Sequence, residues 1–251
     1  MIIGILQARM GSSRLQGKVL MPILGKPMLA LQIERISRAT LIDDLVIATT
    51  INPLDDKIEE LCLSLNVNCY RGSEDDLLDR YYEAAKKYKA NYIVRLTGDD
   101  PLTDPSLINK MISKMKTGCF DAVTNTIYPT YPEGLDLTVL SFKALKRSWN
   151  EADLRSQREH VTPYIFDNFD DFNVFHYKQD IDKSELRWTV DYKKDLIFVK
   201  EIYKSLYSSN KYFSTDDIYK LLEDRPSLIS INSDFVRNTG LLESIKNDKK
   251  V

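Results

Sequence analysis

The sequence predicts an α/β fold whose central sheet is mostly parallel, because short apolar runs alternate along the chain with segments of helical period. Four runs are typical of buried strands, at residues 2–7, 45–50, 92–98 and 121–125. Four segments with apolar residues at helical spacing lie between or after them, at residues 27–39, 55–65, 74–88 and 105–115. In folds of this class helices cover both faces of the sheet, and ligands bind at the carboxyl ends of the strands.

Local signals support the individual elements of this first half. The run IIGILQ is continuously apolar apart from its last residue, as expected of a buried strand. In the first helical segment, Leu29, Ile33 and Ile36 lie along one apolar stripe. Asp104 and Pro105 form an N-cap signal, which predicts where the helix at residues 105–115 begins.

The pattern changes after about residue 128, where the proline-containing segment YPTYPEG interrupts the alternation. Beyond it we expect strands at residues 135–140, 172–177 and 186–190, and helices at residues 142–152, 191–206 and 215–222. No repeat, linker or low-complexity segment divides the chain. The sequence therefore predicts one domain over residues 1–245, whose part from about 128 to 245 elaborates the first half, and a tail at 246–251.

Composition excludes several classes of function. The 35 Lys and Arg residues against 37 Asp and Glu residues give a net charge of -2, so no global positive field attracts a nucleic acid. The three cysteines lack CxxC spacing and the two histidines lie far apart, so we expect no zinc site. No apolar run is long enough to span a membrane and the N-terminus lacks a signal-peptide pattern, so we expect a cytoplasmic protein without a membrane partner.

A basic loop, ARMGSSRLQGKVL, follows the first expected strand at residues 8–20. Its cations Arg9, Arg14 and Lys18 lie within ten residues of one another, and serines and glycines stand between them. Serine hydroxyls, backbone amides exposed by glycine, and long cations are the groups that bind phosphate in proteins. Because the loop follows the first strand of an α/β pattern, this position favours a phosphate-binding loop over a solvated basic turn.

The common nucleotide-binding motifs do not fit this loop. Gly11 and Gly17 are separated by five residues, where a P-loop has four. Val19 stands where a P-loop carries the hydroxyl that binds magnesium, and the GxGxxG fingerprint of dinucleotide-binding folds is absent. The loop is therefore predicted to bind phosphate in a different way.

Two aspartates are expected at strand ends. Asp99 lies in the segment TGDDP, after the expected strand 92–98, where carboxylate oxygens suit a magnesium ion. Asp191 lies in RWTVDYKKDL, and its spacing alone favours an N-cap role for the helix that follows. A triphosphate-binding loop with one or two such carboxylates forms a minimal site for phosphoryl or nucleotidyl transfer, which acts mostly by positioning its reactants.

Several blocks of sequence, in the same order, resemble the CMP-sugar synthetases. The loop at residues 8–20 is similar to the signature loop of that family, which reads close to AR-x-x-S-x-R-L-P-G-K in the CMP-KDO branch. The blocks RGSEDDLLDRYYEAA, VRLTGDDPLTDP, YPEGLDL, REHVTPY and RWTVDY resemble most closely the SpsF-type spore coat polysaccharide cytidylyltransferases, which are related to the acylneuraminate and CMP-KDO enzymes. The resemblance covers about residues 2 to 200 and implies a three-layer nucleotide-diphospho-sugar transferase sandwich of GT-A-like and Rossmann-like type.

This resemblance implies a magnesium-dependent enzyme that transfers CMP from CTP to a sugar acid or related sugar, with release of pyrophosphate, for surface or spore coat polysaccharide. It implies a homodimer, in which residues 128–245 form the acceptor and dimer side. The catalytic residues implied are Lys18, Arg14 and Asp99, with Mg²⁺ held by Asp99 and Asp191. The nucleotide-binding residues implied are Ala8, Arg9, Gly11, Ser12, Arg14, Lys18, Arg71, Gly72, Ser73 and Gly98, of which Arg71 to Ser73 fall where the family binds cytosine. The acceptor-binding residues implied are Asp79, Arg80, Asp136 and His160.

The chain departs from the family pattern at a few positions. Gln16 stands where the loop often has proline, and Thr138 stands where SpsF-like sequences usually carry an acid. The residues Tyr192, Lys193 and Lys194 replace the familiar T-P-E. These changes concern the sugar side more than the nucleotide chemistry, and the sequence does not identify the sugar.

Three alternatives remain open at this stage. One is a sugar-1-phosphate nucleotidylyltransferase on the same fold. A second is a glycosyltransferase, which the sequence disfavours because Pro101 stands where a D-x-D motif needs its second acid. The third is a nucleotide-binding protein without activity. For His160, a general base and a hydrogen-bonded structural histidine are both compatible with the sequence.

Overall fold

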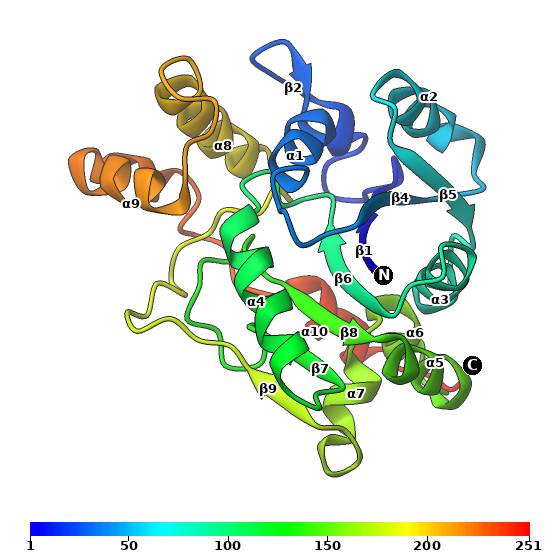
Figure 1. Ribbon diagram of the computed structural model, residues 1–251. Helices are drawn as coiled ribbons and strands as arrows, with labels where there is room; N and C mark the ends of the chain where they lie inside the picture. The colour runs from blue at the N-terminus through cyan, green and yellow to red at the C-terminus, as the bar shows by residue number, and fades with distance from the viewer.

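A seven-stranded sheet forms the middle of the molecule in the computed structural model, which describes all residues from 1 to 251 (Figure 1). From edge to edge its strands are β5 (Asn68–Gly72), β4 (Asp44–Thr50), β1 (Ile2–Gln7), β6 (Tyr92–Thr97), β8 (Thr138–Ser141), β7 (Ala122–Thr124) and β9 (Val174–His176). The first four strands in this order are parallel, whereas β8 runs antiparallel to β6 and β7. A separate two-stranded ribbon consists of β2 (Pro22–Ile23) and β3 (Lys26–Pro27).

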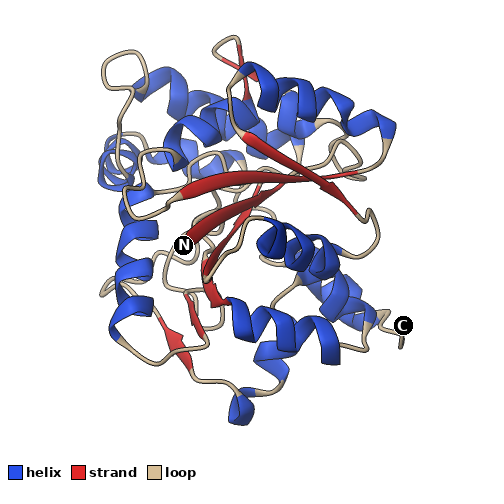
Figure 2. Ribbon diagram, turned by 45° about the vertical axis from the view of Figure 1, so that its right-hand side comes forward, coloured by secondary structure: helices blue, strands red, loops and turns tan.

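Helices cover both faces of the sheet and give the molecule three layers (Figure 2). One face packs against α1 (Met28–Ile36), α2 (Asp56–Ser64), α4 (Pro105–Thr117), α8 (Lys193–Leu206) and α9 (Thr215–Asp224). The other face packs against α3 (Leu77–Lys87), α5 (Phe142–Glu151) and α7 (Pro163–Asp167). On this second side α6 (Arg155–His160) contacts α3, and α10 (Thr239–Lys246) contacts α6.

The expected three-layer α/β sandwich with a mostly parallel sheet is confirmed. In β1, Leu6 joins the hydrophobic core under α1, whereas Ile3 and Ile5 join the core under α3. Successive side chains of a strand point to opposite faces, so a strand buried on both faces must be apolar throughout. The N-cap expected at Asp104 is also present, because its carboxylate accepts hydrogen bonds from the backbone N–H groups of Ser106 and Leu107.

Two expectations about strands were wrong or incomplete. Residues 186–190 are buried but form no ladder, because the N–H groups of Trp188 and Thr189 bond to the carbonyl of Glu133 at 2.6 and 3.0 Å, and that of Val190 bonds to the carbonyl of Asp99 at 2.8 Å. The edge strand β5 was not expected, because its side chains are exposed or only half-buried and give no apolar run. Apolar burial alone therefore does not distinguish a strand from an extended segment held between loops.

The sheet order determines where a ligand can bind. The carboxyl ends of β4, β1 and β6 lie side by side, and the antiparallel β8 begins next to the end of β6. At the other end of the chain, Lys249 and Val251 form backbone hydrogen bonds with Arg155 and Asp153. No helix of the structure is long and apolar enough to cross a membrane.

Candidate active site

The basic loop is held in shape by a buried acid, Asp55, from the turn between β4 and α2. The backbone N–H of Met10 donates to Asp55 Oδ1 at 2.7 Å, and the N–H of Thr50 donates to Asp55 Oδ2 at 3.2 Å. Asp55 is only 1% exposed and also accepts a hydrogen bond from the Thr50 hydroxyl. Gly17, at φ 67°, donates its N–H to the carbonyl of Met10 at 3.0 Å and closes the loop. A positive φ of this kind favours glycine, so the turn depends on this residue.

The loop ends on a buried lysine that contacts both strand-end aspartates. Lys18 Nζ lies 3.1 Å from Asp99 Oδ2 and 2.8 Å from Asp191 Oδ1, and it also donates to the carbonyl of Val190 at 2.8 Å. Arg14 Nη2 lies 2.8 Å from the same Asp191 oxygen. The structure thus brings together four of the residues expected in the site, and Lys18 and Asp191 lie 173 positions apart in the sequence.

Electrostatics keep this cluster charged. Burial raises the pKa of Asp191, but the positive charges of Lys18 and Arg14 outweigh that effect and hold its pKa below the usual range. Burial likewise lowers the pKa of Lys18, and the carboxylates of Asp99 and Asp191 more than offset it, so the pKa is raised. The site therefore holds two cations and two carboxylates in close contact at neutral pH.

Asp191 is not a helix cap, which corrects the interpretation that spacing alone favoured. The residue that caps α8 is Asp195, whose Oδ2 accepts the backbone N–H groups of Asp191 and Tyr192 at 3.0 and 2.9 Å. Asp195 is fully buried and is itself held by Arg187, with Nε to Oδ1 at 2.9 Å. Capping by Asp195 leaves the Asp191 carboxylate free to face Lys18.

The two aspartates form a donor set that fits a magnesium ion. Their carboxylates face one common point, since both contact Lys18 Nζ. Magnesium prefers hard oxygen ligands and usually takes only one or two carboxylates, with phosphate oxygens and water as the remaining ligands. The chain offers no group of three or more His, Cys, Asp or Glu side chains that could hold a metal. Two carboxylates do not complete the coordination of magnesium, so an ion at Asp99 and Asp191 would need phosphate oxygens or water as further ligands.

A glycine allows the end of β6 to approach the start of the loop. Gly98 donates its N–H to the carbonyl of Gln7 at 2.8 Å, and a Cβ at this position would lie 2.8 Å from that oxygen and 3.2 Å from the Ala8 Cβ. Any other residue at position 98 would push Asp99 away from the loop. In turn, Ala8 donates its N–H to the carbonyl of Ala48, which fixes the loop on β4 as well.

The remaining loop residues expected to bind the nucleotide line the same turn. Arg9 is exposed. The Ser12 hydroxyl accepts a hydrogen bond from the N–H of Leu15 at 3.3 Å, within the turn. Gly11 lies near Glu74, because a Cβ at that position would be 3.8 Å from Oε1 of this acid.

The residues expected to contact cytosine lie at the end of β5, since Arg71 and Gly72 are its last two residues and Ser73 follows. The Arg71 side chain is bound to α2, with Nη1 2.7 Å from Asp56 and 2.9 Å from Glu59. A Cβ at Gly72 would lie 2.8 Å from the ring of Tyr70, so this position is restricted to glycine. Ser73 accepts a hydrogen bond from the N–H of Asp76 through its hydroxyl. The guanidinium of Arg71 is therefore bound within the fold, whereas the side chains of Gly72 and Ser73 make no ion pair.

Two of the four residues expected on the acceptor side belong to α3 and are bound to the surrounding fold. Asp79 accepts a hydrogen bond from the indole of Trp149 at 2.9 Å. Arg80 is buried and donates to the carbonyl of Ser73 at 2.9 Å, and burial lowers its pKa to about 10. Arg80 therefore supports the segment at the end of β5, whereas Asp79 connects α3 to α5.

The other two, Asp136 and His160, lie on the β8 side of Asp99. Asp136 pairs with Arg237, and burial raises the pKa of this acid to about 6 despite that partner. His160 Nε2 lies 2.9 Å from the Ser244 hydroxyl of α10, the contact expected of a structural histidine. Burial, with a smaller effect from the charge of Arg95, lowers the pKa of His160 to about 4.

Sequence reasoning missed several residues that shape the site: Asp55, Arg95, Arg187, Asp195 and Arg237. For Arg95 the sequence did contain a signal of a special role, because an arginine inside the apolar run YIVRLT is rarely buried unless it is paired. The partners of Arg187 and Arg237, which include Glu133 and Asp136, lie 54 and 101 positions away and leave no local pattern.

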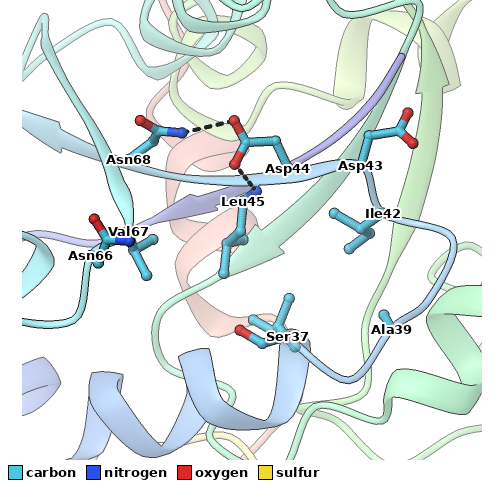
Figure 3. A pocket seen from close by; sticks show the side chains of 10 residues that line it. Ser37, Ala39, Ile42, Asp43, Asp44, Leu45, Asn66, Val67 and Asn68 are labelled. Atoms are coloured by element: carbon cyan, nitrogen blue, oxygen red, sulfur yellow. Dashed lines mark hydrogen bonds between the residues drawn. The ribbon is translucent and has the colours of Figure 1, made fainter.

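A cavity of about 260 Å³ lies away from this cluster (Figure 3). It is lined by residues that follow α1 and by the starts of β4 and β5, among them Ala39, Leu45 and Val67. Its polar groups are engaged locally, since Asp44 accepts hydrogen bonds from Asn68 and from the N–H of Leu45. The cavity is thus at the amino ends of these strands and is not part of the candidate site.

Comparisons with known proteins identify the family to which the chain is related. A family model described as cytidylyltransferase matches residues 3–221. An uncharacterized protein of Methanocaldococcus jannaschii is 41% identical over 92% of this chain and 94% of its own length. The spore coat polysaccharide biosynthesis protein SpsF of Bacillus subtilis is 32% identical over 90% of this chain and 95% of its own length. The 3-deoxy-manno-octulosonate cytidylyltransferase of Zea mays is 36% identical over 49% of this chain and 41% of its own length.

Solved structures show the same fold. A cytidylyltransferase from Leptospira borgpetersenii superposes with a TM-score of 0.88 at 32% identity, over 94% of this chain and 99% of that one. A CMP:2-keto-3-deoxy-manno-octonic acid synthetase in complex with CTP superposes with a TM-score of 0.65 at 20% identity, over 81% of this chain and 98% of that one, which supports the fold alone. The resemblance of the sequence blocks is therefore confirmed, and the chain belongs to the cytidylyltransferase family.

Proposed function

We propose that this cytidylyltransferase transfers CMP from CTP to a sugar acid and releases pyrophosphate, in the synthesis of a surface or spore coat polysaccharide. The observation that carries the proposal is the contact of Lys18 with both Asp99 and Asp191, beside Arg14. Relatives named for spore coat polysaccharide and for 3-deoxy-manno-octulosonate support the acceptor class. We further propose that the protein acts in the cytoplasm as a homodimer.

The residues of the loop would bind the triphosphate. Arg9 is exposed, and Arg14 and Lys18 lie at the end of the sheet where the nucleotide would bind. Bound magnesium, held by Asp99 and Asp191, would neutralise phosphate charge and polarise the reacting phosphoryl group. Lys18 would then exchange carboxylate partners for phosphate oxygens, because a cation between two acids is already positioned for a third anion.

The acceptor would react from the β8 side of Asp99. The anomeric hydroxyl of the sugar acid attacks the α-phosphorus of CTP, the bond from this phosphorus to the bridging oxygen breaks, and pyrophosphate leaves with the electron pair. The proton of the hydroxyl passes to solvent or to a neighbouring base. The fixed cations stabilise the charge that develops on the leaving pyrophosphate without reorganisation, which is the largest contribution expected from a preorganised site.

The substitution Asp99→Asn tests this function. We expect pyrophosphate release from CTP, in the presence of Mg²⁺ and a panel of keto sugar acids and sugar 1-phosphates, to fall by about 100-fold or more, since oriented charge at a transition state is typically worth that much. Asp170→Asn is the control, because this residue is exposed and lies outside the site. Undiminished release by Asp99→Asn would contradict the assignment.

Nucleotide choice is tested separately by thermal shift with the four nucleoside triphosphates and Mg²⁺. A ligand raises the melting temperature according to its occupancy of the native state, so CTP should give the largest shift. Turnover of sugar 1-phosphates alone would replace the proposed acceptor class by a sugar-1-phosphate nucleotidylyltransferase.

A further inference from the structure

An arginine in a central strand lacks partners for its charge. Arg95 belongs to β6, where its neighbours Ile93, Val94 and Leu96 are fully buried. Arg95 is half-buried, and its Nε is shielded from solvent without a hydrogen-bond partner. A buried donor left unsatisfied is costly, which singles this residue out within the sheet.

The neighbours of Arg95 do not supply the missing anion. In the sheet register Arg95 pairs with Thr138 of β8, and the Thr138 hydroxyl is bonded to the Thr124 hydroxyl at 2.9 Å. The positive charge of Arg95 acts to lower the pKa of Asp136, but this acid is already paired with Arg237. The other titratable neighbours of Arg95 are Tyr81 and His160. The Tyr81 hydroxyl donates to the carbonyls of Ile5 and Leu96, and an imidazole is either neutral or positive, so neither group supplies an anion.

The location of Arg95 matches the acceptor side of the reaction. It lies four positions before Asp99 along the chain, on β6. Strand β6 has β1, which leads into the triphosphate-binding loop, on one side and β8 on the other. Arg95 lies on the sheet face that α3 covers, because its register partner Ile5 belongs to the core under that helix. On that face, α6 contributes His160 to its surroundings.

The chemistry of such a position suits a carboxylate. A guanidinium presents a planar fork of N–H donors that matches two carboxylate oxygens, and the pair gains strength where water is scarce. A sugar acid differs from a neutral sugar by this group, so a cation without a partner near the acceptor would select for it. Building on the function proposed above, we propose that Arg95 is the specificity residue that binds the acceptor's carboxylate.

Steady-state kinetics with Arg95→Gln test this assignment. The probes are 3-deoxy-manno-octulosonate and N-acetylneuraminate, with pyrophosphate release as the readout. We expect the KM for the better acceptor to rise by about 10- to 100-fold, whereas the KM for CTP and the thermal shift produced by CTP stay within twofold, because only one ground-state contact is removed. Arg95→Lys should restore part of the loss, since it keeps the charge but not the fork.

The matched control is Arg38→Gln. Arg38 also has a buried guanidinium nitrogen without a partner, and it lies over the Tyr212 ring, away from the site. The substitution Arg38→Gln should leave the KM values for the acceptor and for CTP unchanged. If Arg95→Gln raises the KM for CTP as much as that for the acceptor, or abolishes the CTP thermal shift, the residue is structural and the assignment is wrong.

A second arm tests the carboxylate itself. The wild-type enzyme should prefer each sugar acid over its carboxamide by at least tenfold, and Arg95→Gln should reduce that preference to less than threefold. An unchanged preference would contradict the role of Arg95 while leaving the proposed function intact. If the wild type uses only sugar 1-phosphates, or neither sugar acid, while CTP still raises its melting temperature, both the carboxylate assignment and the sugar-acid acceptor fail, but nucleotide binding stands.

Discussion

At the scale of single residues, the site is built from charges that are buried but paired. Lys18 is only 8% exposed and contacts Asp99 and Asp191, so a cation that would be costly to bury alone is stabilised by two carboxylates. Each partner lies at the end of a different segment, and Asp195 holds the backbone of Asp191 in place. The ammonium group of Lys18 is therefore held in one place by contacts from three sides.

His160 gives a prediction at the same scale, because its charge differs between the folded and unfolded chain. Burial lowers its pKa to about 4, whereas an unfolded histidine titrates near its ordinary value of 6.5. Between these values the unfolded chain binds a proton that the native protein does not, so the free energy of unfolding falls as the pH drops through this range. The loss attributable to His160 should reach about 3 kcal/mol near pH 4.

Urea denaturation at pH 7, 5.5 and 4.5 checks this expectation. The variant His160→Gln should show a shallower decline in stability than the wild type. His176→Gln is the control, because burial lowers the pKa of His176 less than that of His160. Parallel stability curves for the wild type and His160→Gln would contradict the predicted role of this proton.

At the scale of elements, the sequence predicts best what is buried on two faces. Strands β1, β4 and β6 give continuous apolar runs, because helices cover them on both sides. The edge strand β5 gives no such run, and residues 186–190 give one although their backbone bonds go to the loops at Glu133 and Asp99. The loop at residues 8–20 was recognised from its composition and position, but its anchor at Asp55 depends on a contact 45 positions away.

That anchor gives a prediction for the loop as an element. Asp55→Asn replaces an acceptor oxygen by an amide that cannot accept the N–H of Met10 and both donors of Thr50 at once. An unsatisfied buried donor costs about 1–3 kcal/mol, so the loop should be less ordered and the Kd for CTP should rise by about tenfold. Isothermal titration calorimetry with CTP measures this Kd for the wild type and the variant.

The neighbouring Asp56→Asn serves as the control for this substitution. Asp56 is more than half exposed and pairs with Arg71, so its loss should leave the loop in place. Equal CTP affinity for Asp55→Asn and Asp56→Asn would show that the loop does not depend on Asp55.

At the scale of the whole molecule, distant parts of the chain share one site. The first half supplies the triphosphate-binding loop and Asp99, and the second half supplies Asp136 and Asp191. Ordered sequence blocks identified these residues, but no local pattern could show that Lys18 would face Asp191, since pairing across the fold follows only from the assembled sheet. The segment at residues 235–246 falls almost entirely within the part, residues 128–245, that we expected on the acceptor side, although it lies beyond the family match at residues 3–221.

This C-terminal segment gives the last prediction. The Phe235 ring stacks on Tyr192 at a centroid distance of 4.2 Å, Arg237 pairs with Asp136, and the N–H of Asn238 donates to Glu133 at 2.9 Å. Removing residues 235–251 would leave the buried Asp136 without Arg237 and would take one of its partners from Glu133, which keeps Arg187, so we expect a loss of about 2 kcal/mol and a fall in Tm of about 4–8 °C. CTP should still raise the Tm of the shortened protein, because the triphosphate-binding loop and Asp99 remain, whereas turnover of the acceptor should fall by at least tenfold.

Removing only residues 249–251, which bond to Asp153 and Arg155 away from Lys18, is the control and should preserve turnover. Full acceptor turnover in the longer truncation would show that residues 235–246 only cover the fold and do not help to form the acceptor side of the site.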